Sequence, residues 1–261
     1  MTFPPFAGFV RRVVLANVIV FFAVALLGAF GIPGTAFLIG HLELTPALVM
    51  RGEIWQLLTY SFLHFSLLGT LLNMLGLWFI GSFLESSCGS RWTAELYFAS
   101  VLGTALTAMA IGYSRILHQQ PGLTLAGSSG AIFGVFIGFA VLFGEQEIML
   151  FPLPVRIRAK YLAVIYILLE LYPVIRGEYE DLVYLGGALA GYLFAKFAPR
   201  RGLLGGGTEW YFGLRNAYYR SKRRRAAKKF EVYMGKQGRD VRFDRDGKYI
   251  DPDKDSNKWV N

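Results

Sequence analysis

A short polar motif, Gly-Ser-Ser-Gly at residues 127–130, opens the apolar segment Ala131–Gly144. It presents the hydroxyl of Ser129 at the start of a segment from which water should be largely excluded. Serine becomes a nucleophile when a neighbouring base takes its proton, so this placement could support acyl transfer. Small residues also let membrane helices approach closely, and the same four residues would then serve packing or a turn. The surrounding sequence distinguishes these two roles.

The composition indicates a membrane protein. Hydrophobic residues make up 54% of the 261 residues and charged residues only 17%, whereas soluble domains carry about 25% charged residues. The mean hydropathy is +0.41, and the apolar runs end near residue 198. We therefore predict an all-α integral membrane domain over residues 1–200, followed by a basic cytoplasmic tail over residues 201–261.

Six apolar runs predict membrane-spanning helices. A spanning helix needs roughly 20 residues to cross a hydrocarbon core of about 30 Å. The first run resembles a signal peptide, but it lacks a clear small-x-small cleavage site, so we predict an uncleaved helix. Residues 34–55 mix polar and apolar residues and predict a long, partly helical interfacial loop. The six predicted spans are residues 13–30, 57–80, 93–112, 127–144, 161–175 and 182–198.

The charges of the loops predict the orientation of these spans. Six spans place both termini on one side of the membrane, and Lys and Arg gather on the cytoplasmic side. We therefore predict cytoplasmic termini, in a membrane that we expect to be the bacterial cytoplasmic membrane. The side of the termini carries Arg11, Arg12, Arg91, Arg156, Arg158, Lys160 and the tail, and the opposite side carries Arg51, Arg115 and Arg176.

The sequence predicts neither a metal nor a cofactor. Cys88 is the one cysteine of the chain, which excludes an intrachain disulfide and a cysteine-based metal cluster. The three histidines, His41, His64 and His118, lack the His-x-x-x-His and His-Glu-x-x-His spacings of zinc sites. Any chemistry at the motif must therefore come from side chains and backbone groups.

Four motifs stand in order within the six predicted spans. They are Arg51–Tyr60 leading into the second span, His64 with Asn73 in that span, Gly127–Gly130, and Leu185–Gly191 in the sixth span. Each motif is weak alone, but their order in a six-span chain is specific. By these motifs the chain resembles the rhomboid family of intramembrane serine proteases over about residues 10–200. The resemblance implies a six-helix rhomboid-type bundle with the scaffold of a serine-type endopeptidase.

The resemblance assigns the nucleophile position to Ser129 and the position of its general base to Tyr184, where the family carries a histidine. A histidine with a pKa near 6.5 accepts the serine proton at neutral pH, whereas a phenol with a pKa near 10 does not. Loss of the base costs a soluble serine protease about 10⁶ in rate. We therefore predict a broken Ser-His dyad and a weak or inactive pseudoprotease.

The oxyanion site that the resemblance implies is also reduced. The second histidine of the family's second-span pattern is replaced by Gly69, while Asn73, the other side-chain donor, remains. Loss of one oxyanion donor costs about 10²–10³ in rate. Two residues are alternative bases for Ser129: His118 in the loop before the motif, and Glu170 in the fifth span, whose carboxylate could accept a proton.

Other residues are predicted to shape the site. We expect His64 to be an interior polar residue with a structural role, whereas Asn73 fits either a structural or an oxyanion role. Glu53 is predicted to hold the first loop through hydrogen bonds, and Phe133 lies one turn after Ser129 on the same helix face. Small residues for a turn or for close helix packing are Gly127, Gly130, Gly187 and Gly191.

The tail is predicted to adhere to the membrane. Its segment 208–230 is a candidate basic helix, with eight Lys or Arg and no acidic residue between Arg215 and Lys229. Such clusters bind anionic lipid headgroups at about 1 kcal/mol per charge. Contact with RNA is the alternative, and we expect no nucleic-acid partner. A Gly-rich hinge at 200–207 precedes this helix, and a hairpin within 241–250 is predicted to follow it.

The leading hypothesis is that the protein binds the transmembrane helices of client membrane proteins, with proteolysis lost or greatly weakened. By the resemblance, a client helix would enter laterally between the second and fifth spans. Two alternatives remain open. One is an active intramembrane serine endopeptidase with an unusual base, and the other is a non-enzymatic structural or lipid-interacting membrane protein in which Ser129 serves packing alone.

Overall fold

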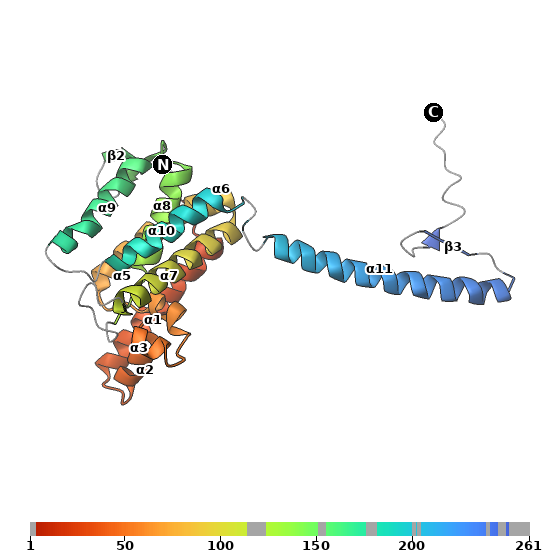
Figure 1. Cartoon of the computed structure of the whole chain (residues 1–261), viewed down its shortest axis with the longest axis horizontal. Coiled ribbons are helices and arrows are strands. Elements are labelled where there is room, and N and C mark those ends of the chain that lie inside the picture. The colour runs from red at the N-terminus through yellow and green to blue at the C-terminus, as the bar shows by residue number, and fades with distance from the viewer. Residues whose placement is uncertain are drawn as a thin grey trace. The chain divides into compact units, whose positions relative to one another are not determined.

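The computed structural model describes residues 4–113, 124–150, 155–175, 182–199, 202, 205–238, 241–244 and 249–250. The chain forms two compact units, Met1–Leu203 and Leu204–Asn261. The first unit is a bundle of helices (Figure 1). The second contains one long helix and a small antiparallel strand pair. Each unit is described by itself.

The first unit consists of helices with one short hairpin. A 3₁₀ turn at Tyr60–Phe62 and a π-helical turn at Leu77–Gly81 interrupt the helical stretches before and after α5. The helices are α1 (Gly8–Ala29), α2 (Thr35–Leu42), α3 (Pro46–Val49), α4 (Gln56–Thr59), α5 (Leu67–Gly76), α6 (Ser82–Cys88), α7 (Ser90–Tyr113), α8 (Ser129–Leu142), α9 (Ala159–Ile175) and α10 (Leu182–Phe197).

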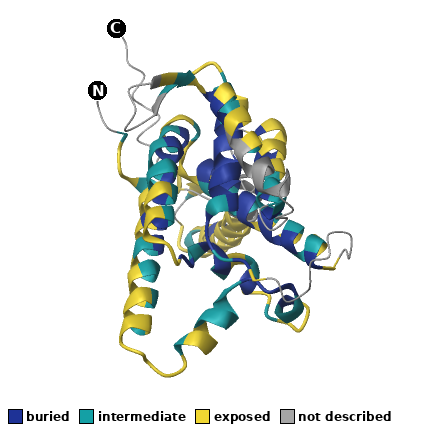
Figure 2. Ribbon diagram, turned by 90° about the vertical axis from the view of Figure 1, so that its left-hand side faces the viewer, coloured by how far each residue is buried: buried dark blue, intermediate teal, exposed yellow. Residues whose placement is uncertain are grey.

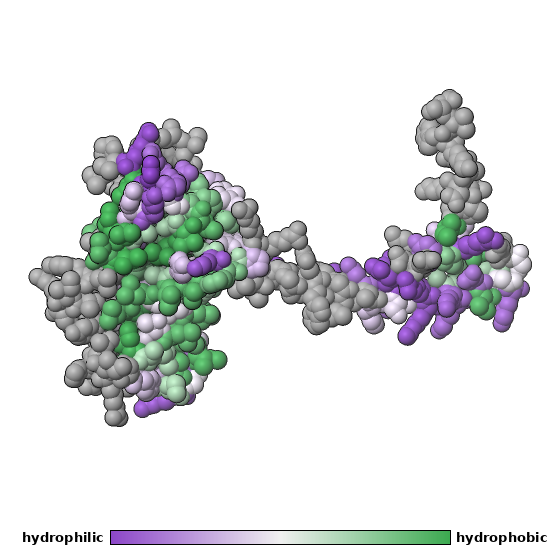
Figure 3. All heavy atoms as spheres, turned by 45° about the horizontal axis from the view of Figure 1, so that its top comes forward, coloured by the Kyte–Doolittle hydropathy of each residue, from purple (hydrophilic) through white to green (hydrophobic). Residues whose placement is uncertain are grey.

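Several of these helices are apolar and long enough to cross a membrane. By length and composition, they are α1, the continuous run Leu67–Cys88 that contains α5 and α6, and α7. Two shorter apolar helices are α8 and α10. Apolar side chains also cover much of the surface of the first unit (Figure 3). The predicted all-α membrane fold is confirmed, while the number of membrane crossings stays a prediction.

The second predicted span begins ten residues later than Leu57, so its predicted start is wrong. The chain forms two short turns up to Phe62 and does not enter α5 until Leu67. The reason is a local cap: Ser66 has an extended backbone, and its Oγ accepts a hydrogen bond from the Gly69 N–H at 3.3 Å. Hydropathy does not reveal such a cap, because the residues on both sides of it are apolar.

The second and third predicted spans also have wrong boundaries, because most of the interval between them, residues 81–92, is helical. Helix α6 continues to Cys88 and α7 begins at Ser90, with Gly89 between them at a φ of +90°. The carboxylate of Glu85, in this interval, accepts hydrogen bonds from the backbone N–H groups of Phe9 and Val10, at 2.6 and 3.0 Å. These groups lie in the first turn of α1, where backbone donors have no intrahelical partner.

The hairpin between α8 and α9 replaces part of the loop predicted at residues 145–160. Strand β1 (Glu147–Leu150) pairs antiparallel with β2 (Val155–Arg158), and Glu147 lies opposite Arg158. Glu145, just before β1, binds Lys160 and Arg158. The sequence pattern pointed to a loop because Pro152 and Pro154 interrupt it; these prolines lie outside the described residues.

The core of the bundle lies where α10 packs against α7 and α8. Every residue of α8 from Gly130 to Phe139 is buried, and buried residues gather in the interior of the bundle (Figure 2). Glycines let the backbones of α8 and α10 lie very close together. A Cβ on Gly187 would overlap the Gly130 carbonyl oxygen, and a Cβ on Gly191 would overlap the backbone of Gly134. Close backbone contact of this kind is the usual reason for small residues in membrane helices.

The second unit contains the predicted basic segment within a single helix, α11 (Gly205–Lys236). The hinge prediction is therefore wrong for Gly205–Gly207, which are helical. Strands β3 (Arg242–Phe243) and β4 (Tyr249–Ile250) pair antiparallel where the hairpin was predicted, and the turn between them lies outside the described residues. An apolar hollow with a volume of about 610 Å³ is lined by Phe230, Met234 and Phe243, among others.

Candidate functional site

The motif at residues 127–130 forms the turn into α8. Gly127 has a φ of +110°, a backbone conformation that favours glycine. Its N–H donates a hydrogen bond to the carbonyl of Tyr60 at 2.9 Å. Ser128 is the N-cap residue and Ser129 the first residue of the helix. The first glycine is therefore required by the turn, and Gly130 by the contact of α8 with α7, where a Cβ would overlap Thr104.

Asn73 and Ser129 lie together although they are 56 residues apart in the sequence. The Nδ2 of Asn73, on α5, donates a hydrogen bond to the Oγ of Ser129 at 3.0 Å. An amide N–H in this position can stabilise negative charge that develops near the serine oxygen. It cannot take up the serine proton, because the Nδ2 of an asparagine is only a donor. Whether Asn73 acts as an oxyanion donor stays a prediction.

Tyr184 lies in the first turn of α10, where it is half-buried. It packs against the apolar cluster that includes Phe133 of α8 and Ala188 of α10. Phe133 is fully buried and lies one turn after Ser129. The structure therefore brings the helix of Tyr184 against the helix of Ser129. The side chain of a tyrosine is a hydrogen-bonding group and a weak acid, and it does not act as a base for serine at neutral pH.

Gly69 lies one turn before Asn73 on α5 and supplies no side-chain donor. A Cβ at this position would meet only the Cβ and Oγ of Ser66 within 4 Å, both at 3.5 Å, which is ordinary van der Waals contact. The glycine is therefore not required by close packing against the described residues. A larger side chain at position 69 has room for its first carbon.

The structure also pairs two residues that the sequence analysis did not connect, His64 and Ser128. The Nε2 of His64 lies 3.1 Å from the Oγ of Ser128 and accepts a hydrogen bond from the Ser128 N–H at 3.3 Å. Both side chains are buried. His64 belongs to the extended segment before α5, outside the helices. The sequence showed Ser128 only as a second serine beside Ser129 in the motif at residues 127–130. Its partner His64 lies 64 residues earlier, so the sequence did not reveal the pair.

The contacts of His64 determine where its proton lies. A backbone N–H can only donate, so the Nε2 that accepts from Ser128 is unprotonated. The proton is then on Nδ1, which lies 3.4 Å from the carbonyl oxygen of Phe62 and donates to it. Burial lowers the pKa of the His64 imidazole, although the bond to Phe62 opposes this effect. His64 is therefore neutral at neutral pH, and the single lone pair of its Nε2 is shared by the N–H and the hydroxyl of Ser128.

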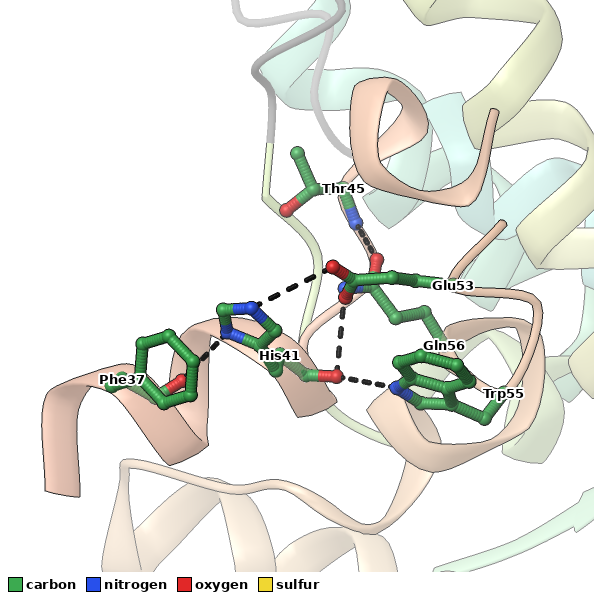
Figure 4. A network of polar contacts seen from close by, with 6 residues as sticks. All are labelled: Phe37, His41, Thr45, Glu53, Trp55 and Gln56. Carbon is green, nitrogen blue, oxygen red and sulfur yellow. Dashed lines mark hydrogen bonds and ion pairs between the residues drawn. The ribbon is translucent and has the colours of Figure 1, made fainter. Parts of the chain in front are cut away.

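A network of polar contacts holds the first loop beside the bundle (Figure 4). The Nε2 of Gln56 donates to Glu53 at 2.7 Å, and its Oε1 accepts from the backbone N–H of Thr45 at 2.9 Å. Trp55 donates from its indole nitrogen to the carbonyl of His41 at 2.8 Å. The carboxylate of Glu53 also lies 3.6 Å from His41 Nε2. These contacts join α2 to α4.

The structure does not test the two alternative bases. His118 lies outside the described residues, and Glu170 lies in α9 but its side chain is not described. Within the described ranges, no group of three or more metal-binding side chains comes together.

Comparisons with known proteins agree on one family. Residues 51–230 match the family model of the Rhomboid domain. Rhomboid-like protein 19 of Arabidopsis thaliana is 27% identical over 178 residues, which cover 65% of this chain and 56% of that protein. Rhomboid protease GlpG of Salmonella newport is 29% identical over 99 residues, which cover 38% of this chain and 32% of that protein. The chain thus spans about half of the plant relative and about a third of the bacterial one.

Proposed function

The chain belongs to the rhomboid family, and on this premise we propose that it binds the transmembrane helices of other membrane proteins while cleavage through Ser129 is lost or greatly weakened. The family supplies the scaffold of an intramembrane serine protease. The observation that carries the proposal is the pairing of Ser129 with a donor, Asn73, on a scaffold whose base position is a tyrosine. Binding needs the scaffold alone, whereas peptide hydrolysis also needs a base.

The energetic argument favours loss of proteolysis. A phenol with an ordinary pKa near 10 is protonated at neutral pH, so Tyr184 would leave the proton on Ser129. Loss of the base alone costs about 10⁶ in rate in soluble serine proteases. The absence of a side-chain donor at Gly69 adds up to about 10²–10³. These factors need not multiply, and the loss of the base is the larger of the two.

The surface of α5 and α9 supports the binding of client helices. Helix α5 exposes a row of leucines, Leu67, Leu68, Leu71 and Leu72, each at least 58% exposed. On α9, Val164 and Leu168 are 52% and 61% exposed. In a membrane these faces contact either lipid or another apolar helix. The rhomboid resemblance implies lateral entry between these two helices, and we propose that a client helix enters there.

The orientation and the tail belong to the same proposal. The loop charges favour cytoplasmic termini, and relatives from a plant and a bacterium leave the bacterial cytoplasmic membrane as an expectation. All eight basic residues between Arg215 and Lys229 are exposed on α11. We propose that they bind anionic lipid headgroups, and that binding weakens as salt screens surface charge within about 8 Å at physiological ionic strength.

Site-specific photo-crosslinking tests the binding proposal. A photoreactive phenylalanine analogue replaces Leu68 or Leu72 on α5, or Leu168 on α9, in protein reconstituted into nanodiscs with a tagged single-span helix of rhomboid-substrate type. Phe22 and Leu26, each 55% exposed on α1, provide matched controls that face lipid. We expect crosslinks to the tagged helix at α5 and α9 at several times the control yield. Equal yields at all positions would contradict client binding at this face.

A further inference from the structure

Ser128 and His64 form a hydrogen-bonded pair beside the family's nucleophile position, and we propose that Ser128, with His64 as its general base, is the reactive serine of this protein. The inference goes beyond the proposed function, because it concerns a different serine and does not depend on client binding. It is consistent with loss of chemistry at Ser129, because the side chain that hydrogen-bonds its Oγ, Asn73, is a donor and not a base.

The side chain of Ser128 is used in an unusual way for its place in the helix. Ser128 is the N-cap residue of α8, where a serine hydroxyl normally accepts a hydrogen bond from the first turn. It makes no such bond, and its Oγ lies 3.1 Å from His64 Nε2 instead. Ser66, at the N-cap of α5, does accept from its helix. The Ser128 hydroxyl is therefore directed at an imidazole lone pair rather than at the backbone.

His64 has the properties that a general base needs. Its Nε2 is unprotonated and within hydrogen-bonding reach of the hydroxyl. The opposite nitrogen, Nδ1, donates to the Phe62 carbonyl, which orients the ring. A nucleophile, a base and a group that orients the base are the three parts of serine nucleophiles on many folds.

The reaction that this pair can perform is acyl transfer to water. The Ser128 oxygen adds to the carbonyl carbon of an ester while its proton moves to His64 Nε2. The tetrahedral adduct then expels the alcohol, which takes that proton, and an acyl-serine remains. Water, deprotonated by the same nitrogen, hydrolyses the acyl-serine to a carboxylic acid and restores both side chains.

Burial limits the substrate to small apolar esters. The exposed fraction is 0% for Ser128 and 7% for His64, so an acyl group must enter the protein to reach them. A compact apolar ester needs a smaller opening than the extended backbone of a peptide does. The N–H groups in the first turn of α8 lack intrahelical acceptors, so they are available as backbone donors for the oxyanion.

Labelling of the full chain with an alkyl fluorophosphonate tests the inference. In this reaction the serine oxygen forms a bond to phosphorus, fluoride leaves, and the proton moves to the base. The protein is reconstituted into nanodiscs, and the labelled residue is identified by peptide fragmentation. We expect the adduct on Ser128. We also expect a labelling rate that is constant above about pH 6.5 and falls at lower pH, because burial lowers the pKa of His64 from its ordinary value.

Two variants separate a base from a structural contact. His64→Gln can retain a hydrogen bond to Ser128 but cannot act as a base, and we expect labelling to fall at least about 100-fold with little change in unfolding temperature. Ser100→Ala is the matched control, since Ser100 is also buried and its Oγ donates to the Leu96 carbonyl at 2.9 Å. Its labelling should equal that of the native protein.

The site of the adduct in the native protein decides the inference even where a variant does not fold. No adduct in the native protein would overturn the reactivity of Ser128 and leave the proposed function intact. An adduct on Ser129 would overturn this inference and the proposed loss of chemistry at Ser129, while client binding would still be decided by the crosslinking experiment. Native labelling rates in a folded His64→Gln variant would show that His64 is not the base.

Discussion

Helix α8 meets its neighbours in two different ways on its two sides. Toward α10 it packs through glycines, and the Gly134–Gly191 approach leaves no room for a Cβ. Toward α5 the contact includes the hydrogen bond from Asn73 to Ser129, and α5 exposes its leucines away from the core. We call the α8–α10 contact the closed side of α8, because it cannot loosen without losing its packing. The α5 contact, which we call the open side, joins this hydrogen bond to apolar packing, since Met74 of α5 is buried in the same core as Phe136 of α8. The closed side fixes the helix that carries Ser129, and the open side is where we propose that a client helix enters.

A side chain inserted between α8 and α10 tests how tightly the closed side is packed. Of the changes considered, we expect this one to have the largest effect on stability. In Gly191→Leu, the new Cβ would overlap the backbone of Gly134. Overpacking costs about 1–3 kcal/mol where neighbours can shift, and backbone atoms shift less readily, so we expect loss of the folded protein. Gly28→Leu on α1 is the matched control, because no described atom lies within 4 Å of a Cβ there. Similar unfolding temperatures for both variants in detergent would contradict the comparison.

Tyr184→His tests whether the closed side still holds a catalytic geometry. It returns a group with a pKa near 6.5 to the helix that packs against α8. We expect cleavage of a rhomboid-type membrane substrate to rise by about 10²–10⁴ over the native protein. Loss of this gain in Tyr184→His combined with Ser129→Ala would assign it to Ser129. Efficient cleavage by the native protein would instead show that another residue serves as base.

Gly69→His, added to Tyr184→His, tests whether the open side can regain an oxyanion donor. The first carbon of the new side chain has room beside Ser66. We expect a further increase in cleavage, up to about 10²-fold, because one oxyanion donor contributes about 10²–10³. Gly69→Leu in the same background is the control, since it adds bulk without a donor. An equal increase with leucine would exclude an oxyanion role for position 69.

The two sides also differ in how far the sequence predicted them. The α8–α10 side follows from long apolar runs and from glycines such as Gly187 and Gly191, whose spacing is visible in the sequence. On the other side, the start of α5 depends on one hydrogen bond from the Gly69 N–H to Ser66, which hydropathy does not encode. The pairing of His64 with Ser128 escaped prediction because the two residues are 64 positions apart and the family pattern gives neither of them a partner.

Gln56→Leu tests how firmly the first loop is held on the open side. Gln56 is fully buried, and it bonds both the Glu53 carboxylate and the Thr45 N–H. Leucine would leave these two groups without that partner, at a cost of about 1–3 kcal/mol. We expect a lower unfolding temperature, measured by thermal denaturation in detergent. Gln146→Leu, at an exposed glutamine, is the control that should change it little.

Gly69→Ala has the smallest expected effect, but it discriminates well, because the comparison of the two sides predicts whether the protein becomes more or less stable. If glycine served close packing here, as it does at Gly191, a methyl group would destabilise the protein. The nearest described atoms are those of Ser66 at 3.5 Å, and the residue lies in the helix α5. Alanine restricts the unfolded chain more than glycine does, so it should stabilise by about 0.4–1 kcal/mol. We therefore expect a small rise in unfolding temperature in detergent and in lipid. A fall in both media would show that α5 is as closely packed as the α8–α10 side, and that the open side is not open.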